Sequence, residues 1–208
     1  VQQYLDDAFT VSPQGGSGVA TTAGDYLTTP TSSTFSFDAD FTVEGWVYQT
    51  SRGNNGVVTE VGAYTNGVMI RLGTAGGIYD KVYVNNTTVA SIASYIALNT
   101  WAHIAVVRSG TTATVYVDGV SRGSATVSGT VNSPAYETRL FAPLHTTATN
   151  QPFFGYISNF RIVKGTALYT SSFTPPTAPL EVLPNTSLLC NFTNASIIDA
   201  TGKNVIET

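Results

Sequence analysis

Apolar and polar residues alternate with a period of two in many short stretches of this chain. Residues 41–47, FTVEGWV, show the pattern most clearly. One face of such a strand carries Phe41, Val43 and Val47, and the other carries Thr42, Glu44 and Trp46. This alternation is typical of β-strands that turn one face toward a core. Similar stretches, separated by Gly, Asn, Asp and Pro, predict strands at residues 57–61, 68–72, 79–84, 123–127, 138–141, 153–163, 187–191 and 204–207.

Two further stretches carry stronger signals than alternation alone. Residues 101–108 are largely apolar on both faces, which predicts a central strand covered on both sides. In residues 114–120, TVYVDGV, the Asp118-Gly119 pair predicts a two-residue hairpin, because both turn positions need a positive φ. So many short strands, with turns about every 8–12 residues, predict an all-β jelly-roll sandwich of two antiparallel sheets.

Composition and charge exclude several function classes. Charged residues make up only 11% of the 208 residues, well below the usual proportion of about a quarter. The net charge is −4 and the nine Lys and Arg residues are scattered singly, so we expect no nucleic-acid binding. No apolar run reaches the roughly 18 residues of a membrane span, so we expect no membrane insertion. The single cysteine, Cys190, excludes an internal disulfide and is expected to be a buried apolar residue.

Four motifs, taken together, resemble a known family. They are FTVEGWVY at residues 41–48, WAHIAVVRSG at 101–110, VYVDG at 115–119 and GYISNFRIVKGTALYTSSFTPPTAPL at 155–180. In this order and spacing they resemble the laminin-G-like domains of the concanavalin A-like lectin/glucanase superfamily, in the branch found in tail-fibre and other virion structural proteins of cyanophages and marine phages. The resemblance extends from Gly24 to the C-terminus. It implies a jelly-roll fold and a location on the external surface of a virion, with an extracellular location as the alternative.

The resemblance also bears on domain organisation. We expect residues 1–208 to form a single domain. The chain begins with Val1 rather than Met, and residues 199–204, DATGKN, are similar to a stretch that stands at module junctions in related sequences. We therefore expect this domain to be one module of a longer chain.

The motif at residues 155–180 is expected to be a strand followed by a packing segment. Alternation divides the strand's apolar side chains between two faces, with Ile157 and Val163 opposite Tyr156, Phe160 and Ile162. The residues that follow, 168–180, are expected to cross an end of the sandwich. Their prolines cannot donate to a β-ladder, so we expect them to protect a sheet edge against pairing with another chain.

Enzymes of this superfamily carry carboxylates at alternate positions of one strand, so that a nucleophile and an acid/base share a face about 5 Å apart. The nearest approach here is Asp38, Asp40 and Glu44. Two carboxylates four residues apart along a strand are about 13 Å apart, so we expect no enzymatic activity. We interpret Glu44 as a hydrogen-bonded structural carboxylate beside Trp46. His103 lies among apolar strand residues and is expected to be a core histidine.

Calcium is the one cofactor that the resemblance suggests, because laminin-G-like domains often hold one Ca²⁺ at the rim of the sandwich. Asp199 matches that pattern, with Asn204 as a second ligand. Residues 199–202, Asp-x-Thr-Gly, also form a good Asx turn. An aspartate that relatives carry before a Gly-x-x-Tyr stretch is missing at residues 22–26 of this chain. Two interpretations stay open: a Ca²⁺ site at Asp199 and Asn204, or a turn without a cofactor.

Carbohydrate recognition needs flat aromatic faces for the C–H surface of a sugar and planar polar groups for its hydroxyls. The loops between the expected strands supply both kinds of group. Our candidates for carbohydrate binding are Arg52, Asn54, Asn55, Tyr64, Asn66, Tyr79, Asp80 and His145. Similar loops contain Tyr136, Asn150 and Gln151.

These observations and the resemblance lead to a hypothesis about function. We expect a non-enzymatic module of a virion surface, fibre or appendage, which mediates adhesion by binding cell-surface glycan through loops at the sandwich edge. Many copies on one particle, or a homo-oligomer, would raise a weak individual affinity. The alternative is a purely structural capsid-decoration or fibre-assembly domain that contacts another virion protein and has no glycan site. A secreted bacterial adhesin module is a third candidate.

Overall fold

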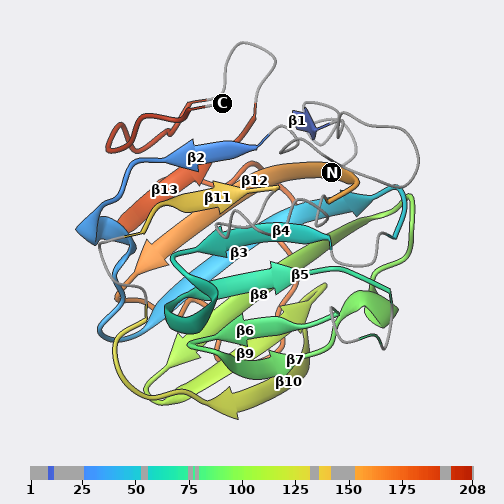
Figure 1. The fold of residues 1–208 in the computed structure, drawn as a ribbon, viewed down its shortest axis with the longest axis horizontal. Helices are drawn as coiled ribbons and strands as arrows, with labels where there is room; N and C mark the ends of the chain where they lie inside the picture. Colours follow the sequence, from blue (N-terminus) through green and yellow to red (C-terminus); the bar gives the residue numbers. More distant parts are fainter. Residues whose placement is uncertain are drawn as a thin grey trace.

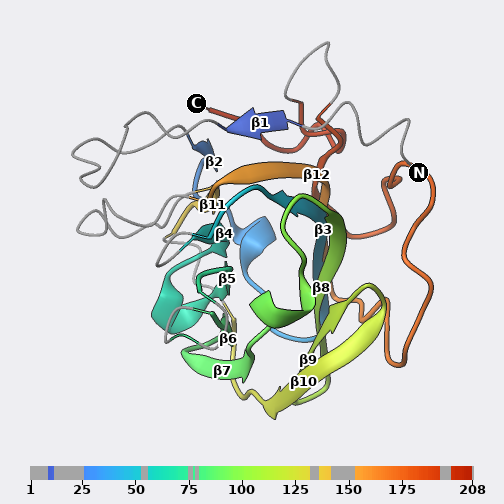
Figure 2. The ribbon, with the colours of Figure 1, turned by 90° about the vertical axis from the view of Figure 1, so that its right-hand side faces the viewer.

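In the computed structural model, the described residues form two antiparallel β-sheets that pack face to face (Figures 1 and 2). These residues are 9–11, 26–52, 56–74, 77, 80–131, 136–141, 153–192 and 198–207. The expected all-β sandwich is thereby confirmed. Within the described part of the chain, no helix is long and apolar enough to span a membrane.

Seven of the described strands form one sheet and six form the other. The first sheet has the order β1 (Phe9–Val11), β12 (Gly155–Lys164), β3 (Phe41–Gln49), β8 (Trp101–Ser109), β9 (Thr112–Val117) and β10 (Val120–Thr126), and β13 (Thr186–Cys190) also pairs with β12. The second has the order β2 (Leu27–Thr29), β11 (Thr138–Leu140), β4 (Val57–Val61), β5 (Val68–Arg71), β6 (Val82–Val84) and β7 (Thr87–Ala90). Short 3₁₀-helices occur at η1 (Ser33–Phe35), η2 (Tyr64–Asn66) and η3 (Ala93–Tyr95). Strands distant in sequence therefore lie side by side, as β3 does with β12.

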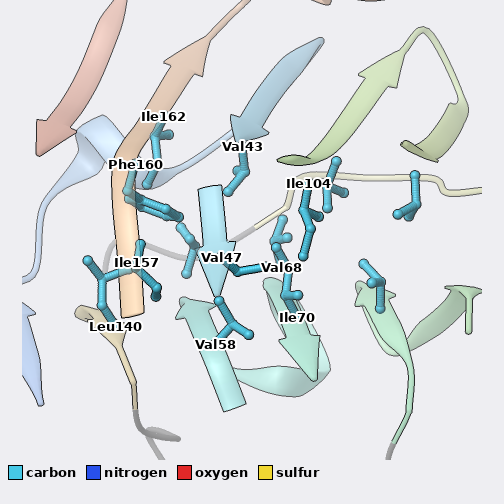
Figure 3. Packing of buried hydrophobic residues seen from close by; sticks show 14 of the residues in the cluster. Val43, Val47, Val58, Val68, Ile70, Ile104, Leu140, Ile157, Phe160 and Ile162 are labelled. Carbon is cyan, nitrogen blue, oxygen red and sulfur yellow. The ribbon is translucent and has the colours of Figure 1, made fainter. Parts of the chain in front are cut away.

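The core lies between the two sheets and is built from alternate strand residues. Val43 and Val47 of β3 and Ile104 of β8 lie in one buried cluster with Val58 of β4 and Ile70 of β5 (Figure 3). The opposite faces of β3 and β8 are also largely buried, since a later segment of the chain covers them. The expected central strand is confirmed, because β8 lies between β3 and β9 with both faces covered.

Strand β12 departs from simple alternation. Asn159 has a positive φ of 50°, and the pairing of β12 with β3 shifts register around it. This β-bulge inserts one residue, so that Ile157, Phe160 and Ile162 all face the core (Figure 3). The prediction that Phe160 and Ile162 lie opposite Ile157 was wrong, because an extra residue reverses the alternation beyond it.

The hairpin between β9 and β10 is confirmed. Asp118 and Gly119 have positive φ values of 51° and 74°, and the two strands pair directly on either side of them. Farther along β10, Gly123 lies against β7 of the other sheet, where a Cβ would sit 2.8 Å from the carbonyl oxygen of Val89. The close approach of β10 to β7 closes the sandwich along this side.

C-terminal residues cover sheet edges on the other side. The backbone of Glu207 exchanges two hydrogen bonds with Thr28 of β2, and Ala200 donates its N–H to Leu189 of β13. Glu207 forms an isolated bridge, so the strand expected at residues 204–207 is reduced to one pair. These contacts occupy backbone groups that would otherwise pair with another chain.

Residues 165–180, here called the covering segment, lie over the outer face of the seven-stranded sheet (Figure 2). Leu168 donates its backbone N–H to the hydroxyl of Thr42 on β3. Phe173 donates its backbone N–H to the Gly119 carbonyl at the hairpin. The expectation that residues 168–180 cross an end of the sandwich was wrong, since hydrogen bonds to β3 and to the β9–β10 hairpin turn hold them over one sheet face as a third layer.

Candidate functional site

Three aromatic side chains lie in contact on the outer face of the seven-stranded sheet. They are Tyr48 in β3, Trp101 at the start of β8 and Tyr156 near the start of β12. The ring centroid of Tyr48 lies 5.5 Å from that of Trp101 and 5.5 Å from that of Tyr156. The centroids of Trp101 and Tyr156 are 6.5 Å apart. All three side chains are partly exposed, and we call this set the aromatic surface.

Strand pairing fixes the aromatic surface. Tyr48 is the register partner of both Trp101 and Tyr156, and directly opposed side chains on one face of a sheet contact each other. Gly155 allows β12 to start close to β3: its φ is +154°, and a Cβ there would lie 1.9 Å from the Tyr48 carbonyl oxygen. The three rings are therefore positioned by backbone structure.

Along the same face, the aromatic surface is followed by buried residues. Trp46 is only 7% exposed, and its ring meets His103 edge-on with centroids 5.3 Å apart. His103 in turn contacts Tyr169 and Phe173 of the covering segment. Those two rings stack on each other with centroids 3.6 Å apart. The covering segment thus closes the sheet face on this side of the aromatic surface.

A buried ionic cluster lies beneath the covering segment. Glu44 is fully buried, and its Oε1 accepts hydrogen bonds from Nε and Nη2 of Arg161 at 2.9 and 2.6 Å. Its Oε2 accepts a hydrogen bond from the Tyr169 hydroxyl at 2.9 Å and lies 3.2 Å from Nε2 of His103. The interpretation of Glu44 as a hydrogen-bonded structural carboxylate is confirmed.

Charges within this cluster shift the pKa of two of its members. Burial by itself would raise the pKa of Glu44, but the hydrogen bond from His103 and the positive charge of Arg161 outweigh burial and lower it. Burial, and then the negative charge of Glu44, raise the pKa of the Tyr169 hydroxyl. The cluster therefore joins an ionised carboxylate to a neutral phenol, and it ties the covering segment to the sheet.

Two residues expected to bind carbohydrate hold the η3 turn. Asp80 is 1% exposed, and its Oδ1 accepts backbone hydrogen bonds from Ile92 and Ala93 at 3.1 and 2.6 Å. Nη2 of Arg52 donates to the carbonyls of Ala93 and Ile96 at 2.8 and 2.6 Å. Sugar binding by either side chain would compete with these hydrogen bonds, so their role in binding stays a prediction.

The remaining loop candidates are placed only in part. Asn66 is partly exposed and ends η2, which begins at Tyr64. Four candidates lie outside the described residues, namely Asn54, Asn55, Tyr79 and His145. Carbohydrate binding by all six positions stays a prediction.

Five hydrogen bonds hold the carboxylate of Asp199, at distances of 2.6 to 3.0 Å. Its Oδ1 accepts from the backbone N–H groups of Leu189 and Thr201. Its Oδ2 accepts from the Thr201 hydroxyl and from both the backbone and side-chain amides of Asn204. The side-chain amide of Asn204 also donates to the Ser187 carbonyl. This turn attaches the C-terminal residues to β13.

These hydrogen bonds bear on the two interpretations of residues 199–204, the Asx turn and the Ca²⁺ site. Ca²⁺ takes about six to eight oxygen ligands, but donors already occupy both carboxylate oxygens of Asp199. Among the described residues, no group of three or more His, Cys, Asp and Glu side chains is arranged to hold a metal ion. Asp199 and Asn204 therefore form the Asx turn, and Ca²⁺ binding by them stays a prediction that would require these hydrogen bonds to be exchanged for metal ligation.

Replacing Asp199 with alanine is expected to lower the free energy of unfolding by about 2–3 kcal/mol, because buried N–H groups lose their acceptor. Urea unfolding measures this loss, and exposed Asp38 supplies the control D38A. Adding CaCl₂ or EDTA should leave the thermal midpoint of the wild type unchanged. A rise with CaCl₂ that D199A abolishes would contradict the turn interpretation.

The aromatic surface was not expected from the sequence, since our candidates for carbohydrate binding were all loop residues. The available signal was an outward-facing aromatic residue near one end of each of three strands. Such residues are scattered in sequence, and they form a surface only when β3 pairs with both β8 and β12.

Comparisons with known proteins agree with the fold. A Bacteroides ovatus protein proposed to bind carbohydrate is similar with a TM-score of 0.64 and 18% identity, over 88% of this chain and 57% of that one. This chain thus spans little more than half of that protein. A weaker likeness is to a SAP-like pentraxin from Limulus polyphemus, with a TM-score of 0.49 and 14% identity over 77% of this chain and 76% of that one. Another is to domain 4 of an extracellular arabinanase from Geobacillus stearothermophilus, with a TM-score of 0.47 and 20% identity over 63% of each chain. At 18% identity the first likeness shows the fold alone.

Unlike these likenesses in structure, a match in sequence shows which family the chain belongs to. No curated protein matches this chain in sequence. The model of one family does match, over residues 21–169, a span that contains the strands from β2 to β12 and all three residues of the aromatic surface. The chain therefore belongs to the concanavalin A-like lectin/glucanases superfamily.

Proposed function

We propose that this domain is a glycan-binding adhesion module, and that the aromatic surface is where the sugar binds. The observation that carries the proposal is the contact of three partly exposed rings, Tyr48, Trp101 and Tyr156, on one sheet face. Aromatic faces match the C–H surface of a sugar ring, and side chains held by strands lose little freedom on binding. A partly exposed aromatic cluster is also where binding energy tends to concentrate.

Membership in the family also supports glycan binding. It unites lectins with glucanases, and the similar Bacteroides ovatus protein is itself proposed to bind carbohydrate. The site proposed here differs from the loops first considered, since it lies on a sheet face. Loop residues such as Asn66 would then either contact another part of the ligand or not contact the ligand at all.

We also propose that the domain binds without catalysis. Glu44, the carboxylate nearest to the enzymatic pattern, is fully buried, and both of its oxygens are hydrogen-bonded to Arg161 and Tyr169. A glycosidase needs two carboxylates that reach the scissile bond. A substrate would reach Glu44 only after the covering segment had moved away.

The proposed location is the outer surface of a phage particle, as part of a fibre or appendage. Support for this location is the resemblance of the four sequence motifs to phage virion proteins. Many copies on one particle would convert a weak affinity for host glycan into firm attachment. Antibodies raised against the domain should label intact purified particles; labelling of bacterial cell walls instead would favour a secreted adhesin.

Replacing Trp101 with alanine is expected to weaken glycan binding at least about 30-fold, the effect of losing about 2 kcal/mol from a binding hot spot. A glycan array with the multimerised wild type identifies the ligand, and calorimetry then compares the variants. Tyr95, which is 48% exposed on η3, supplies the control Y95A, expected to bind as the wild type does.

Two outcomes would contradict the proposal in different ways. If the multimerised wild type binds no glycan, the purely structural role in a capsid or fibre becomes the better account. If W101A binds as tightly as the wild type while remaining folded, the domain binds glycan at a site other than the aromatic surface.

A further inference from the structure

We infer that the aromatic surface takes a single neutral sugar at the end of a glycan chain, rather than the middle of a polysaccharide. This inference rests on the proposed function and names the class of ligand for that site. Its grounds are the size and tilt of the three rings, the position of the covering segment, and the pairing of the charged groups nearby.

The first ground is the size and shape of the surface. Three centroids within 6.5 Å of one another make a compact patch. The rings are also tilted, with interplanar angles of 59° for Tyr48 and Trp101, 83° for Tyr48 and Tyr156, and 55° for Trp101 and Tyr156. Edge-to-face packing of this kind leaves no flat strip on which successive sugars of a chain would stack. One apolar sugar face fits the patch.

The second ground is that the path along the strands is blocked. His103 lies two residues from Trp101 along β8, about 7 Å away, and Tyr169 and Phe173 of the covering segment lie against it. A glycan chain that ran from the aromatic surface toward the centre of the sheet would meet this raised layer. A terminal sugar has no such continuation on one side, so it enters without a clash.

The third ground is the electrostatic character of the surroundings. The first ion pair along this face joins Glu44 to Arg161, and both side chains are buried beneath the covering segment. Arg52, in the loop that follows β3, already donates to two carbonyls. Among the described residues, Glu44 and Arg161 are therefore engaged with each other, and Nη2 of Arg52 is engaged by two carbonyls. A ligand carboxylate at the aromatic surface would lose solvation without gaining a partner from the Glu44–Arg161 pair. A neutral sugar carries no such penalty.

The test compares matched probes on the intact domain. We expect binding to N-acetyllactosamine or to another neutral terminal sugar on the array, and a loss of at least about tenfold when that terminus carries sialic acid. Among cellobiose, cellotetraose and cellohexaose, or the corresponding series of the sugar that binds, affinity should change less than about twofold with length. The variant W101A should lose the binding in each case.

Each alternative result has a distinct meaning. Affinity that rises about tenfold with chain length, or preferential binding of alginate or hyaluronan oligomers, would overturn the inference while leaving a glycan-binding function in place. Absence of binding to every probe would remove the proposed function and the inference together.

Discussion

Replacing Glu44 with alanine is expected to lower the free energy of unfolding by about 3–5 kcal/mol, the cost of breaking a buried ion pair from one side. Arg161 is only 5% exposed, and it would keep its charge after losing both hydrogen bonds to Oε1. The hydroxyl of Tyr169 would also lose its acceptor. Urea unfolding, read by tryptophan fluorescence and by circular dichroism, measures the change.

A matched control separates the effect of burial from the loss of charge. Glu137 pairs with Arg139 on the other sheet, but its side chain is 28% exposed, so E137A should cost no more than about 1 kcal/mol. If E44A and E137A cost the same, the Glu44 cluster would not be what holds the covering segment to the sheet.

The same cluster predicts a pH dependence of stability. The pKa of Glu44 in the folded protein lies below its ordinary value of 4.5, so folding favours the ionised form. Its contribution is therefore complete above the unfolded pKa and is lost as the pH falls through the lower, folded pKa. The variant E44Q should be less stable than the wild type at neutral pH, and the difference should shrink as the pH falls below about 4.5. A difference that grows on acidification would contradict this sign.

Replacing Gly119 with alanine is expected to lower the free energy of unfolding by about 2–4 kcal/mol and to displace the covering segment. Gly119 has a φ of +74°, which costs any other residue about 1–2 kcal/mol. In addition, a Cβ would lie 1.7 Å from the carbonyl oxygen of Phe173, a backbone atom that a rotamer change cannot move. The segment must therefore shift away from the hairpin.

Gly129 provides the control for this prediction. Its φ of +76° is nearly the same, but a Cβ there would have no heavy atom within 4 Å, so G129A should show only the cost of the backbone conformation. Limited digestion with chymotrypsin should cut G119A after Tyr169 or Phe173 faster than it cuts G129A or the wild type. Equal rates and equal stabilities would mean that the covering segment is not anchored at the hairpin.

Local signals in the sequence were reliable where the structure they describe is itself local. The alternation of residues 41–47 places Val43 and Val47 in the core, and Asp118-Gly119 forms the hairpin turn. The predicted burial of both faces of residues 101–108 also holds. The hairpin turn depends on contacts between neighbouring residues, and burial depends on how apolar residues are divided between the two faces of a strand. Both can be read from a short stretch of sequence.

Other features depended on contacts between distant parts of the chain. Strands β2 and β7 have only three and four residues, too few to show a period, and they exist because neighbouring strands pair with them. The bulge at Asn159 follows from the fit of β12 to β3. Asp80 and Arg52 looked like ligands in the sequence because the turn that they bind, η3, is formed by residues far along the chain.

The sequence by itself determined the fold class and the main strands, because these follow from the period of the pattern and from turn chemistry. Tertiary structure alone decided that residues 165–180 cover a sheet face and that Asp199 forms a turn. It also decided that Tyr48, Trp101 and Tyr156 meet in one surface. The physical reason is register: outside a tight hairpin, which residues of distant strands stand opposite one another depends on pairing across the whole sheet, and a short stretch of sequence does not specify it.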